Sequence, residues 1–305
     1  MIYQKALISL VLIIAVLASV AAAVGILSNE GPGGYEYESI RGETVRIYGQ
    51  GIYQHMTADV AIQGIAQDYI TLFAAVPLLL IALFFSRMGS LRGRFLLAGT
   101  LFYFLVTYLF YLTMGMYNFL FLVYAVLLCC SFFALFLVLT ELNLPDLGDL
   151  FTSDKAARYA GGYLIFSAYS VAFLWLSIIM PPLLDGTLFP KSLEHYTALI
   201  VQGLNLGLLL PVSFIVGLML FRRQRVGYLF GLPYVVFLSL MMSALTAKIL
   251  AMALNGVNVI PVIFIMPTFA LIAITFSVWL MRSIQNDNHY ETLDFYVDKF
   301  REIKQ

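Results

Sequence analysis

The chain has 305 residues, of which 62% are hydrophobic and 11% are charged, and its formal net charge is zero. A soluble protein carries about 25% charged residues, so this composition excludes an ordinary soluble domain and indicates a protein embedded in a lipid bilayer. The zero net charge gives no reason to expect nucleic acid as a partner.

Eight stretches of the chain are long and apolar enough to cross a bilayer, because a spanning helix needs about 20 apolar residues. The predicted spans, in chain order, lie at about 6–28, 69–86, 95–114, 119–140, 160–182, 198–221, 226–252 and 259–281. We therefore predict an all-α fold, a polytopic transmembrane helix bundle that forms a single membrane domain over residues 1–305.

The first predicted span has a second interpretation. Lys5, the apolar stretch that follows it and the small residues Ala21, Ala22 and Ala23 are also typical of a cleaved signal peptide. The stretch is long for a signal peptide, so we favour a retained span. Cleavage would leave the direction of every later span unchanged.

Lysine and arginine residues gather in alternate gaps between the predicted spans. They lie before the first span and after the second, fourth, sixth and eighth: Lys5, Arg87, Arg92, Arg94, Lys155, Arg158, Arg222, Arg223, Arg225, Arg282, Lys299, Arg301 and Lys304. The intervening gaps hold Arg41, Arg46 and Lys191, and Lys248 lies inside a span. Because positively charged loops stay in the cytoplasm, we expect both termini to be cytoplasmic.

Longer segments flank some of the spans. The gaps at 29–66 and 183–197 lie on the outer side of this topology, and we expect them to form a compact cap. In the last segment, 284–305, apolar residues recur at helical spacing among charges: Leu293, Tyr296, Val297 and Phe300. This spacing predicts an amphipathic cytoplasmic helix that lies on the inner membrane surface or against a protein partner.

The two halves of the chain resemble each other in layout. Pro77 follows Asp68 by nine residues in the second span, and Pro211 follows Gln202 by nine residues in the sixth. A basic turn with a glycine and a further span follow in each case. This pattern indicates two parallel four-helix repeats related by an axis along the membrane normal, with chance similarity between apolar segments as the alternative.

A polar stripe precedes the second span. His55, Asp59, Gln63, Gln67 and Thr71 recur every four residues, which places them on one face of an α-helix. The helix either runs into the second span or lies on the membrane as a separate element. Its polar face is then either in water at the interface or part of the wall of an outward-facing cavity. A metal site is a weaker interpretation, because glutamine is a poor metal ligand.

Further polar residues lie at a similar depth in the membrane. Counted at about 1.5 Å per residue from the inner arginines, they reach the outer boundary of a hydrocarbon core about 30 Å thick. These residues are Asp68, Gln202, Asn205 and Lys248. Lys248 then either extends its ammonium group to lipid headgroups or pairs with Asp68 or Glu194. A buried lysine needs such an acidic partner to stay charged.

Several chemistries are excluded by the residues that are missing from the spans. None of His55, His195 and His289 lies inside a span, so a haem held by paired histidines within the bundle is excluded. The sequence contains no HExxH, GxSxG or P-loop motif, and we expect neither a metal nor another cofactor. Cys129 and Cys130 are adjacent, which does not suit a disulfide between them, and we interpret both as packing residues.

Three runs of the chain, QGIAQDYITLFAAVPLLLI, RMGSLRGRFLLAGTLFYF and VQGLNLGLLLPVSFIVGLMLFRR, resemble segments of uncharacterised prokaryotic multi-pass membrane proteins. The resemblance covers most of residues 45–255. It implies a bacterial or archaeal cell membrane, but it implies no activity. In that family's pattern an aspartate is usual where this chain has Asn205, and this departure weakens any argument that position 205 needs a charge.

Three functional hypotheses follow from these observations. The leading one is a multi-pass membrane protein that binds or passes a small solute or ion through an outward-facing polar cavity. We predict that the residues lining this cavity are Asp59, Gln63, Gln67, Asp68, Gln202, Asn205 and Lys248. The second is a membrane enzyme that acts on a lipid or headgroup at the outer leaflet, with acid–base groups from His55, Asp59, Glu194 and His195. The third is a non-catalytic membrane subunit or anchor of a larger complex. Of these we favour a protein that is not an enzyme.

Overall fold

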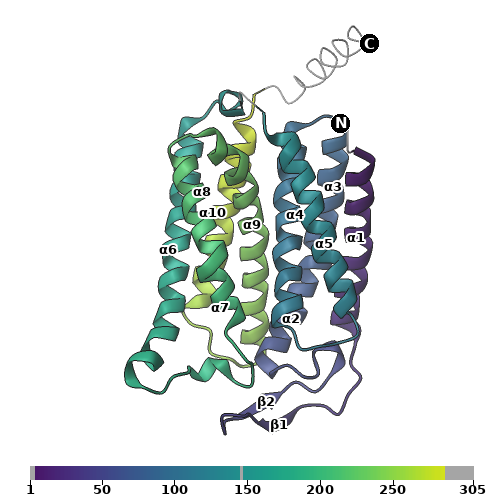
Figure 1. Ribbon diagram of the computed structural model, residues 1–305, viewed down its shortest axis with the longest axis vertical. Helices are drawn as coiled ribbons and strands as arrows, with labels where there is room; N and C mark the ends of the chain where they lie inside the picture. The colour runs from purple at the N-terminus through teal and green to yellow at the C-terminus, as the bar shows by residue number, and fades with distance from the viewer. Residues whose placement is uncertain (1–3, 145–146, 286–305) are drawn as a thin grey trace.

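The computed structural model describes residues 4–144 and 147–285. Within these ranges, eight helical segments are long and apolar enough to cross a membrane, which confirms the predicted all-α bundle of eight spans. Figure 1 shows the helices side by side, with α1 at one edge of the bundle and α6 at the other. The amphipathic helix predicted over 284–305 falls, from residue 286 onward, outside the described residues.

The helices of the bundle have the following bounds: α1 Gln4–Leu27, α2 Ala58–Ile70, α3 Val76–Arg87, α4 Leu91–Met114, α5 Phe121–Leu142, α6 Asp154–Asp185, α7 Ile200–Leu204, α8 Leu210–Phe221, α9 Arg225–Leu254 and α10 Val262–Arg282. Two π-helical segments join α2 to α3 and α7 to α8: η2 Thr71–Ala75 and η5 Asn205–Leu209. The shorter elements are an antiparallel hairpin and three 3-10 turns: β1 Tyr35–Glu38, β2 Thr44–Ile47, η1 Gly51–Tyr53, η3 Leu147–Leu150 and η4 Lys191–Leu193.

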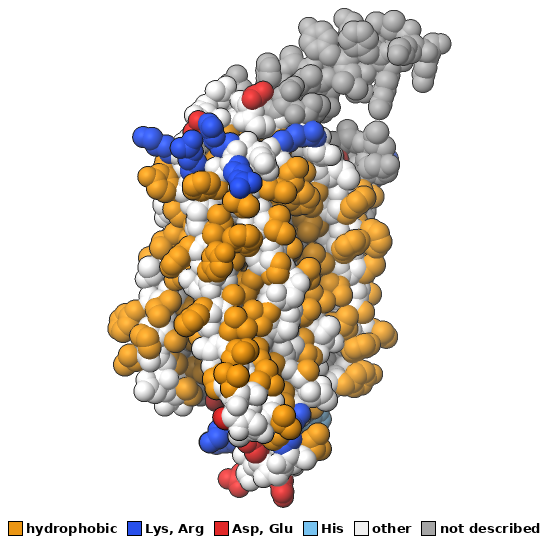
Figure 2. Space-filling view, turned by 60° about the vertical axis from the view of Figure 1, so that its left-hand side comes forward, with side chains coloured by type: hydrophobic (Ala, Val, Ile, Leu, Met, Phe, Trp, Pro, Cys, Tyr) orange, Lys and Arg blue, Asp and Glu red, His pale blue; other side chains and the backbone are white. Residues whose placement is uncertain are grey.

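The two ends of the bundle differ in chemistry. One end, called the arginine end, carries the turns from α3 to α4, from α5 to α6 and from α8 to α9, with Arg87, Arg158 and Arg225 in or beside them. Figure 2 shows Lys and Arg side chains gathered at this end, beyond a broad belt of hydrophobic side chains. The opposite end, called the cap end, carries the β1–β2 hairpin (Figure 1). An apolar belt between two polar ends is the surface that a lipid bilayer requires.

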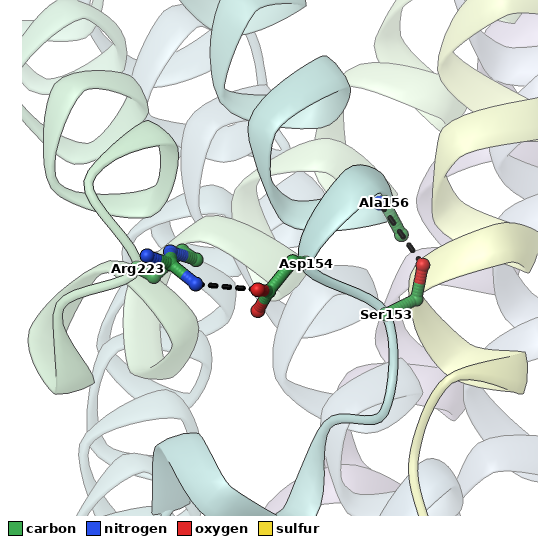
Figure 3. Close-up of polar contacts among 4 residues, drawn as sticks. All are labelled: Ser153, Asp154, Ala156 and Arg223. Atoms are coloured by element: carbon green, nitrogen blue, oxygen red, sulfur yellow. Dashed lines mark hydrogen bonds and ion pairs between the residues drawn. The ribbon is translucent and has the colours of Figure 1, made fainter.

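Local contacts fix the start of α6 at the arginine end. The Ser153 hydroxyl accepts a hydrogen bond from the Ala156 backbone N–H at 3.2 Å, which caps the helix. The next residue, Asp154, pairs with Arg223 from the turn between α8 and α9 (Figure 3). Both side chains of this pair are largely exposed, so the pair contributes about 0–1 kcal/mol. The hydrogen bond of the Ser153 N-cap contributes about 1 kcal/mol, so it determines the start of α6 at least as strongly as the ion pair does.

The two halves of the chain repeat the same succession of elements. In the first half α2 passes through η2 into α3, and in the second half α7 passes through η5 into α8. A constant spacing of 134 residues relates Thr71 to Asn205, where the π-helical segments begin, and Pro77 to Pro211, which follow them. An interruption of the same kind at corresponding positions supports the predicted pair of parallel repeats, α1–α5 and α6–α10.

The repeats also share a close contact between helices. Gly93 in α4 lies against the backbone of Ser86, and Gly227 in α9 lies against the backbone of Leu220. The same spacing of 134 residues relates the corresponding members of the two contacts. A Cβ on either glycine would come closer than 3.0 Å to backbone atoms. Glycine therefore lets α4 approach the end of α3, and α9 the end of α8, in the same way.

Corresponding helices of the two repeats, α4 and α9, meet at the centre of the bundle. Gly99 in α4 packs on Pro233 and Val236 in α9, and Phe102 stacks on Phe237 with their ring centroids 4.6 Å apart. Figure 1 shows the other helices of the first repeat on one side of this pair and those of the second repeat on the other. The repeat axis therefore runs between α4 and α9, along the length of the bundle.

Neighbouring glycines in α6 provide a matched test of this packing. A Cβ on Gly161 would approach the Phe221 nitrogen to 2.5 Å, whereas Gly162 has no neighbour within 4 Å. We expect Gly161→Ala to lower the free energy of unfolding by about 1–3 kcal/mol through overpacking. Gly162→Ala should be neutral or stabilising by up to about 1 kcal/mol, since alanine favours the helix. Thermal unfolding in detergent measures both variants, and equal losses would contradict the close contact of α6 with α8.

Candidate functional site

The centre of the candidate site is the carboxylate of Asp68, which is 2% exposed. α2 begins at Ala58, so His55 lies in an exposed turn before the helix and is not part of the stripe as predicted. The rest of the polar stripe enters the bundle, because α2 continues into the span instead of forming a separate helix on the membrane surface. The Tyr53 hydroxyl donates to Asp68 Oδ2 at 2.5 Å, and the Tyr111 hydroxyl donates to Oδ1 at 2.9 Å. Each carboxylate oxygen therefore accepts a hydrogen bond, which a buried carboxylate requires.

Tyr53 reaches Asp68 from the loop that follows α1. This loop is held at the end of α1 because the Ile52 N–H donates to the Ser28 hydroxyl at 3.0 Å. Burial raises the pKa of Tyr53 well above its usual value, and the negative charge of Asp68 adds to this rise. The Tyr53 hydroxyl consequently keeps its proton at neutral pH and remains a donor to the carboxylate.

Two glycines make room for the contact between Tyr53 and Asp68. A Cβ on Gly25 in α1 would overlap the Asp68 carboxylate, and a Cβ on Gly64 in α2 would come within 2.8 Å of the Tyr53 ring. A glycine inside a helix costs about 1 kcal/mol relative to alanine. Here that cost is offset because the missing side chains let the carboxylate and the ring enter the space between α1 and α2.

Lys248 in α9 is the second charged group of the site. It is half-buried and close enough to Asp68 for each charge to act on the other. Within the described part of the chain, the two side chains form no ion pair at 4.0 Å or less. The helices that carry the two residues, α2 and α9, pack against each other. One repeat therefore supplies the carboxylate and the other supplies the ammonium group.

Two small pockets at the cap end are lined in part by the tyrosines that hold Asp68. Tyr111, Gly115, Asn118 and Tyr124 line both pockets, and Tyr53 lines one of them. Their cavity volumes are about 70 and 30 Å³. A cavity of about 10–15 Å³ already holds a water molecule, whereas sites for drug-sized ligands have about 300–1,000 Å³. In this conformation the approach to the tyrosines has room for a few water molecules and not for a larger solute.

Gln67 and Thr71 lie next to Asp68 and are buried against α4. Gln67 Nε2 donates to the Tyr103 hydroxyl at 2.6 Å and, at 3.4 Å, to the Thr107 hydroxyl. The hydroxyls of Thr71 and Tyr103 are 2.9 Å apart. This half of the predicted stripe is therefore an internal hydrogen-bond network, and not a surface in contact with bulk water.

The remaining predicted lining residues lie apart from this cluster. Asp59 is exposed and Gln63 is half-buried, both nearer the cap end of α2. Gln202 and Asn205 are half-buried in the other repeat, where Asn205 Nδ2 donates to a carbonyl oxygen of its own helix at 2.7 Å. Among residues 4–144 and 147–285, none of these four side chains hydrogen-bonds to Asp68.

The enzyme hypothesis relies on acid–base candidates that lie in the cap, where the loops of the two repeats meet: His55, Glu194 and His195. His195 Nε2 lies 3.1 Å from the carbonyl oxygen of His55, and the Arg41 guanidinium donates to the Glu194 carbonyl at 3.1 Å. Burial raises the pKa of Glu194, although a hydrogen bond with Thr57 opposes the rise. In the described structure neither of these histidines hydrogen-bonds to a carboxylate, so the acid–base pair of the enzyme hypothesis is not assembled there.

The tyrosines and the threonine that surround Asp68 and Gln67 are not among the residues predicted from the sequence to form the site. Tyr103, Thr107 and Tyr111 recur every four residues along α4, which is the same signal that the stripe on α2 gives. Tyr53 has no such signal. It comes from an irregular segment, and its contact with Asp68 depends on how the loop folds back over the bundle.

Comparisons with models of protein families, with curated proteins and with solved structures find no match to this chain. The resemblance to uncharacterised prokaryotic membrane proteins therefore stays a prediction. The fold and the site define a class of protein: a multi-pass membrane protein whose bundle contains a buried carboxylate held by tyrosine hydroxyls.

The hydroxyls of Tyr53 and Tyr111 can be removed one at a time. Tyr53→Phe and Tyr111→Phe each leave one buried oxygen of Asp68 without its donor, so we expect each to lower the free energy of unfolding by about 1–3 kcal/mol. Tyr117 is 79% exposed, and Tyr117→Phe should change stability by less than about 0.5 kcal/mol. Thermal unfolding of the three variants in detergent is the measurement. Losses no larger than that of the Tyr117 control would show that the hydroxyls do not hold the carboxylate.

Proposed function

We propose that the protein is a transport protein of a prokaryotic cell membrane, which binds a proton at Asp68 and passes it across the bilayer. The observation that carries this proposal is the buried carboxylate itself. An ionisable group inside a membrane-spanning bundle is costly and marks an ion or proton pathway in many membrane proteins. Asp68 is such a group, and it lies beside Tyr53 and Tyr111, which also line the small pockets at the cap end.

The size and charge of the site favour a proton over a larger solute or a metal cation. The pockets of about 70 and 30 Å³ suit water molecules. In the described residues, no group of three or more His, Cys, Asp or Glu side chains could hold a metal ion. The positive charge of Lys248 repels any cation near Asp68, but a proton forms a covalent O–H bond with the carboxylate that offsets this repulsion, and a metal cation does not. A tyrosine hydroxyl can donate and accept a hydrogen bond, so Tyr111 can hand a proton from pocket water to the carboxylate.

The interruptions in the two repeats support a transport role. Short or interrupted spans at corresponding positions of two repeats are the best sequence pointer to the binding site of a transporter, and π-helical turns are frequent at functional sites. η2 begins three residues after Asp68, and η5 lies at the corresponding place in the second repeat. The positive-inside rule places the arginine end in the cytoplasm, so the pockets would open to the outside.

The chemistry of the proposed step is the binding and release of one proton. Asp68 in its charged form accepts the hydrogen bonds of Tyr53 and Tyr111. When a hydronium ion in the pocket gives up a proton, one of its O–H bonds breaks and a water molecule is left. A new O–H bond forms on one carboxylate oxygen of Asp68, and the negative charge is lost. The attraction between Asp68 and Lys248 then ends, and this weakens one of the electrostatic interactions between the two repeats. Loss of the proton restores both the charge and the attraction.

Proton uptake into liposomes tests this function. The purified protein is reconstituted with a pH-sensitive dye inside the vesicles, and a potassium gradient with valinomycin makes the interior negative. We expect the unchanged protein to acidify the interior faster than protein-free vesicles do, and Asp68→Asn to remove the difference. Asp59→Asn is the matched control, because Asp59 lies on the same helix but is exposed.

Each outcome of this experiment decides between the hypotheses. Acidification that depends on Asp68 and not on Asp59 supports proton transport. Equal acidification in protein-free vesicles and in vesicles with the unchanged protein contradicts it, and would favour the anchor hypothesis. Rapid acidification that Asp68→Asn leaves unchanged would show a proton path elsewhere in the protein.

A further inference from the structure

A closed ring of hydrogen bonds lies beside Asp68, between α2 and α4. The Thr71 hydroxyl donates its single proton to the Gln67 backbone carbonyl at 2.9 Å. In the contact between Thr71 and Tyr103, Tyr103 must therefore be the donor. Tyr103 in turn accepts a hydrogen bond from Gln67 Nε2. The ring runs from the Gln67 side chain through Tyr103 and Thr71 back to the Gln67 backbone, and every hydroxyl proton in it is used.

One atom of this ring has no partner. Gln67 is 2% exposed, and its Oε1 atom is buried without a hydrogen bond. A buried polar atom left unpaired costs about 1–3 kcal/mol. A hydrogen-bond donor next to Gln67 Oε1 would remove this cost. If the amide is turned over, Oε1 competes with the Thr71 hydroxyl for the single Tyr103 proton, and Nε2 becomes the atom that lacks a partner. A water molecule both donates and accepts, so it satisfies Gln67 in either orientation.

The position of the ring is central in the bundle. Tyr103 lies 12 residues after Leu91 at the start of α4, which has 24 residues, so it is about 18 Å along a helix of about 36 Å. The ring also includes Thr71, the first residue of the π-helical segment η2. The second repeat forms the same π-helical turn without this polar cluster, so the turn itself is not evidence for water. The observation that points to an internal water is the buried, unpaired Gln67 Oε1 atom.

We propose that Gln67, Thr71, Tyr103 and Thr107 form a water-binding site at the centre of the bundle, which continues the Asp68 site towards the arginine end. The water donates to Gln67 Oε1 and lies beside the Tyr103 hydroxyl. In this proposal the bound water also accepts the proton that Asp68 releases, and this role rests on the proposed function. The binding of water itself does not depend on that function.

Hydroxyl-radical footprinting with X-rays tests the water site directly. Irradiation turns bound water into radicals that oxidise adjacent side chains, and mass spectrometry of the full chain in detergent locates the products. Tyr103 is 0% exposed, so we expect it to be oxidised only through internal water. The matched control is Tyr234 in the second repeat, which is 2% exposed and donates to the Leu209 carbonyl in η5 at 2.7 Å. Tyr103 should be oxidised several-fold faster than Tyr234.

Two variants on α2 distinguish an effect of the bound water on Tyr103 oxidation from an effect of altered packing. Gln67→Leu removes the vacant acceptor, and we expect it to lower the oxidation of Tyr103 to the rate of Tyr234. Gln63→Leu, one turn away and half-buried, should leave the Tyr103 rate unchanged. Should Gln67→Leu fail to fold, the comparison of Tyr103 with Tyr234 in the unchanged protein still decides. Equal slow oxidation of these two tyrosines would overturn the water site.

The liposome assay then tests the role of the site in transport. We expect Gln67→Leu to slow the acidification and Gln63→Leu to leave it unchanged. Acidification that depends on Asp68, together with an unoxidised Tyr103, would overturn this inference and leave the proposed function in place. A rapidly oxidised Tyr103 in a protein that transports no protons would overturn the function and support the water site alone.

Discussion

The burial of the Asp68 carboxylate among apolar helices is the constraint on which the rest of the first repeat depends. Removing a carboxylate from water costs several kcal/mol even after the surroundings relax, so the fold must surround it with donors. Tyr111 supplies one from α4, and Tyr53 supplies the other from the loop after α1. Glycine at positions 25 and 64 leaves the space that the Asp68 carboxylate and the Tyr53 ring occupy. Four segments of the chain are thus shaped by one charged group.

At the depth of Asp68, the two repeats have the same backbone structure but different side chains. The spacing of 134 residues relates Asp68 to Gln202, Thr71 to Asn205, Tyr103 to Phe237, Thr107 to Met241 and Tyr111 to Leu245. The polar cluster of the first repeat is therefore replaced in the second by amides and apolar side chains. The second repeat contributes Lys248 instead, and the corresponding residue of the first repeat is Met114. Each repeat supplies one charged residue, and these two residues lie on α2 and α9, which pack against each other.

How much of the fold and of the candidate site could be predicted from the sequence depends on how far apart in the chain the contacting residues lie. The eight spans follow from hydropathy, and the stripe from Asp59 to Thr71 follows from helical spacing, because both are local properties. The partners of Asp68 could not be assigned, since Tyr53 and Tyr111 lie 15 and 43 residues away. Depth counting placed Gln202 and Asn205 at the level of Asp68, but depth does not say on which side of a bundle a residue lies. The same counting puts Lys248 at a similar depth, and here the packing of α2 on α9 puts it on a helix next to Asp68, without an ion pair at 4.0 Å or less.

A purely structural role accounts poorly for this arrangement. A buried ionic group held only for stability can often be replaced by apolar residues of similar volume at no loss, and sometimes with a gain of 1–4 kcal/mol. The second repeat shows that this backbone forms with Phe237 and Leu245 where the first has Tyr103 and Tyr111. The π-helical turn occurs in both repeats, so the polar cluster is not needed to produce it. What the polar cluster adds to the first repeat is a chargeable group, hydroxyls that can exchange protons, and an approach through small pockets at the cap end.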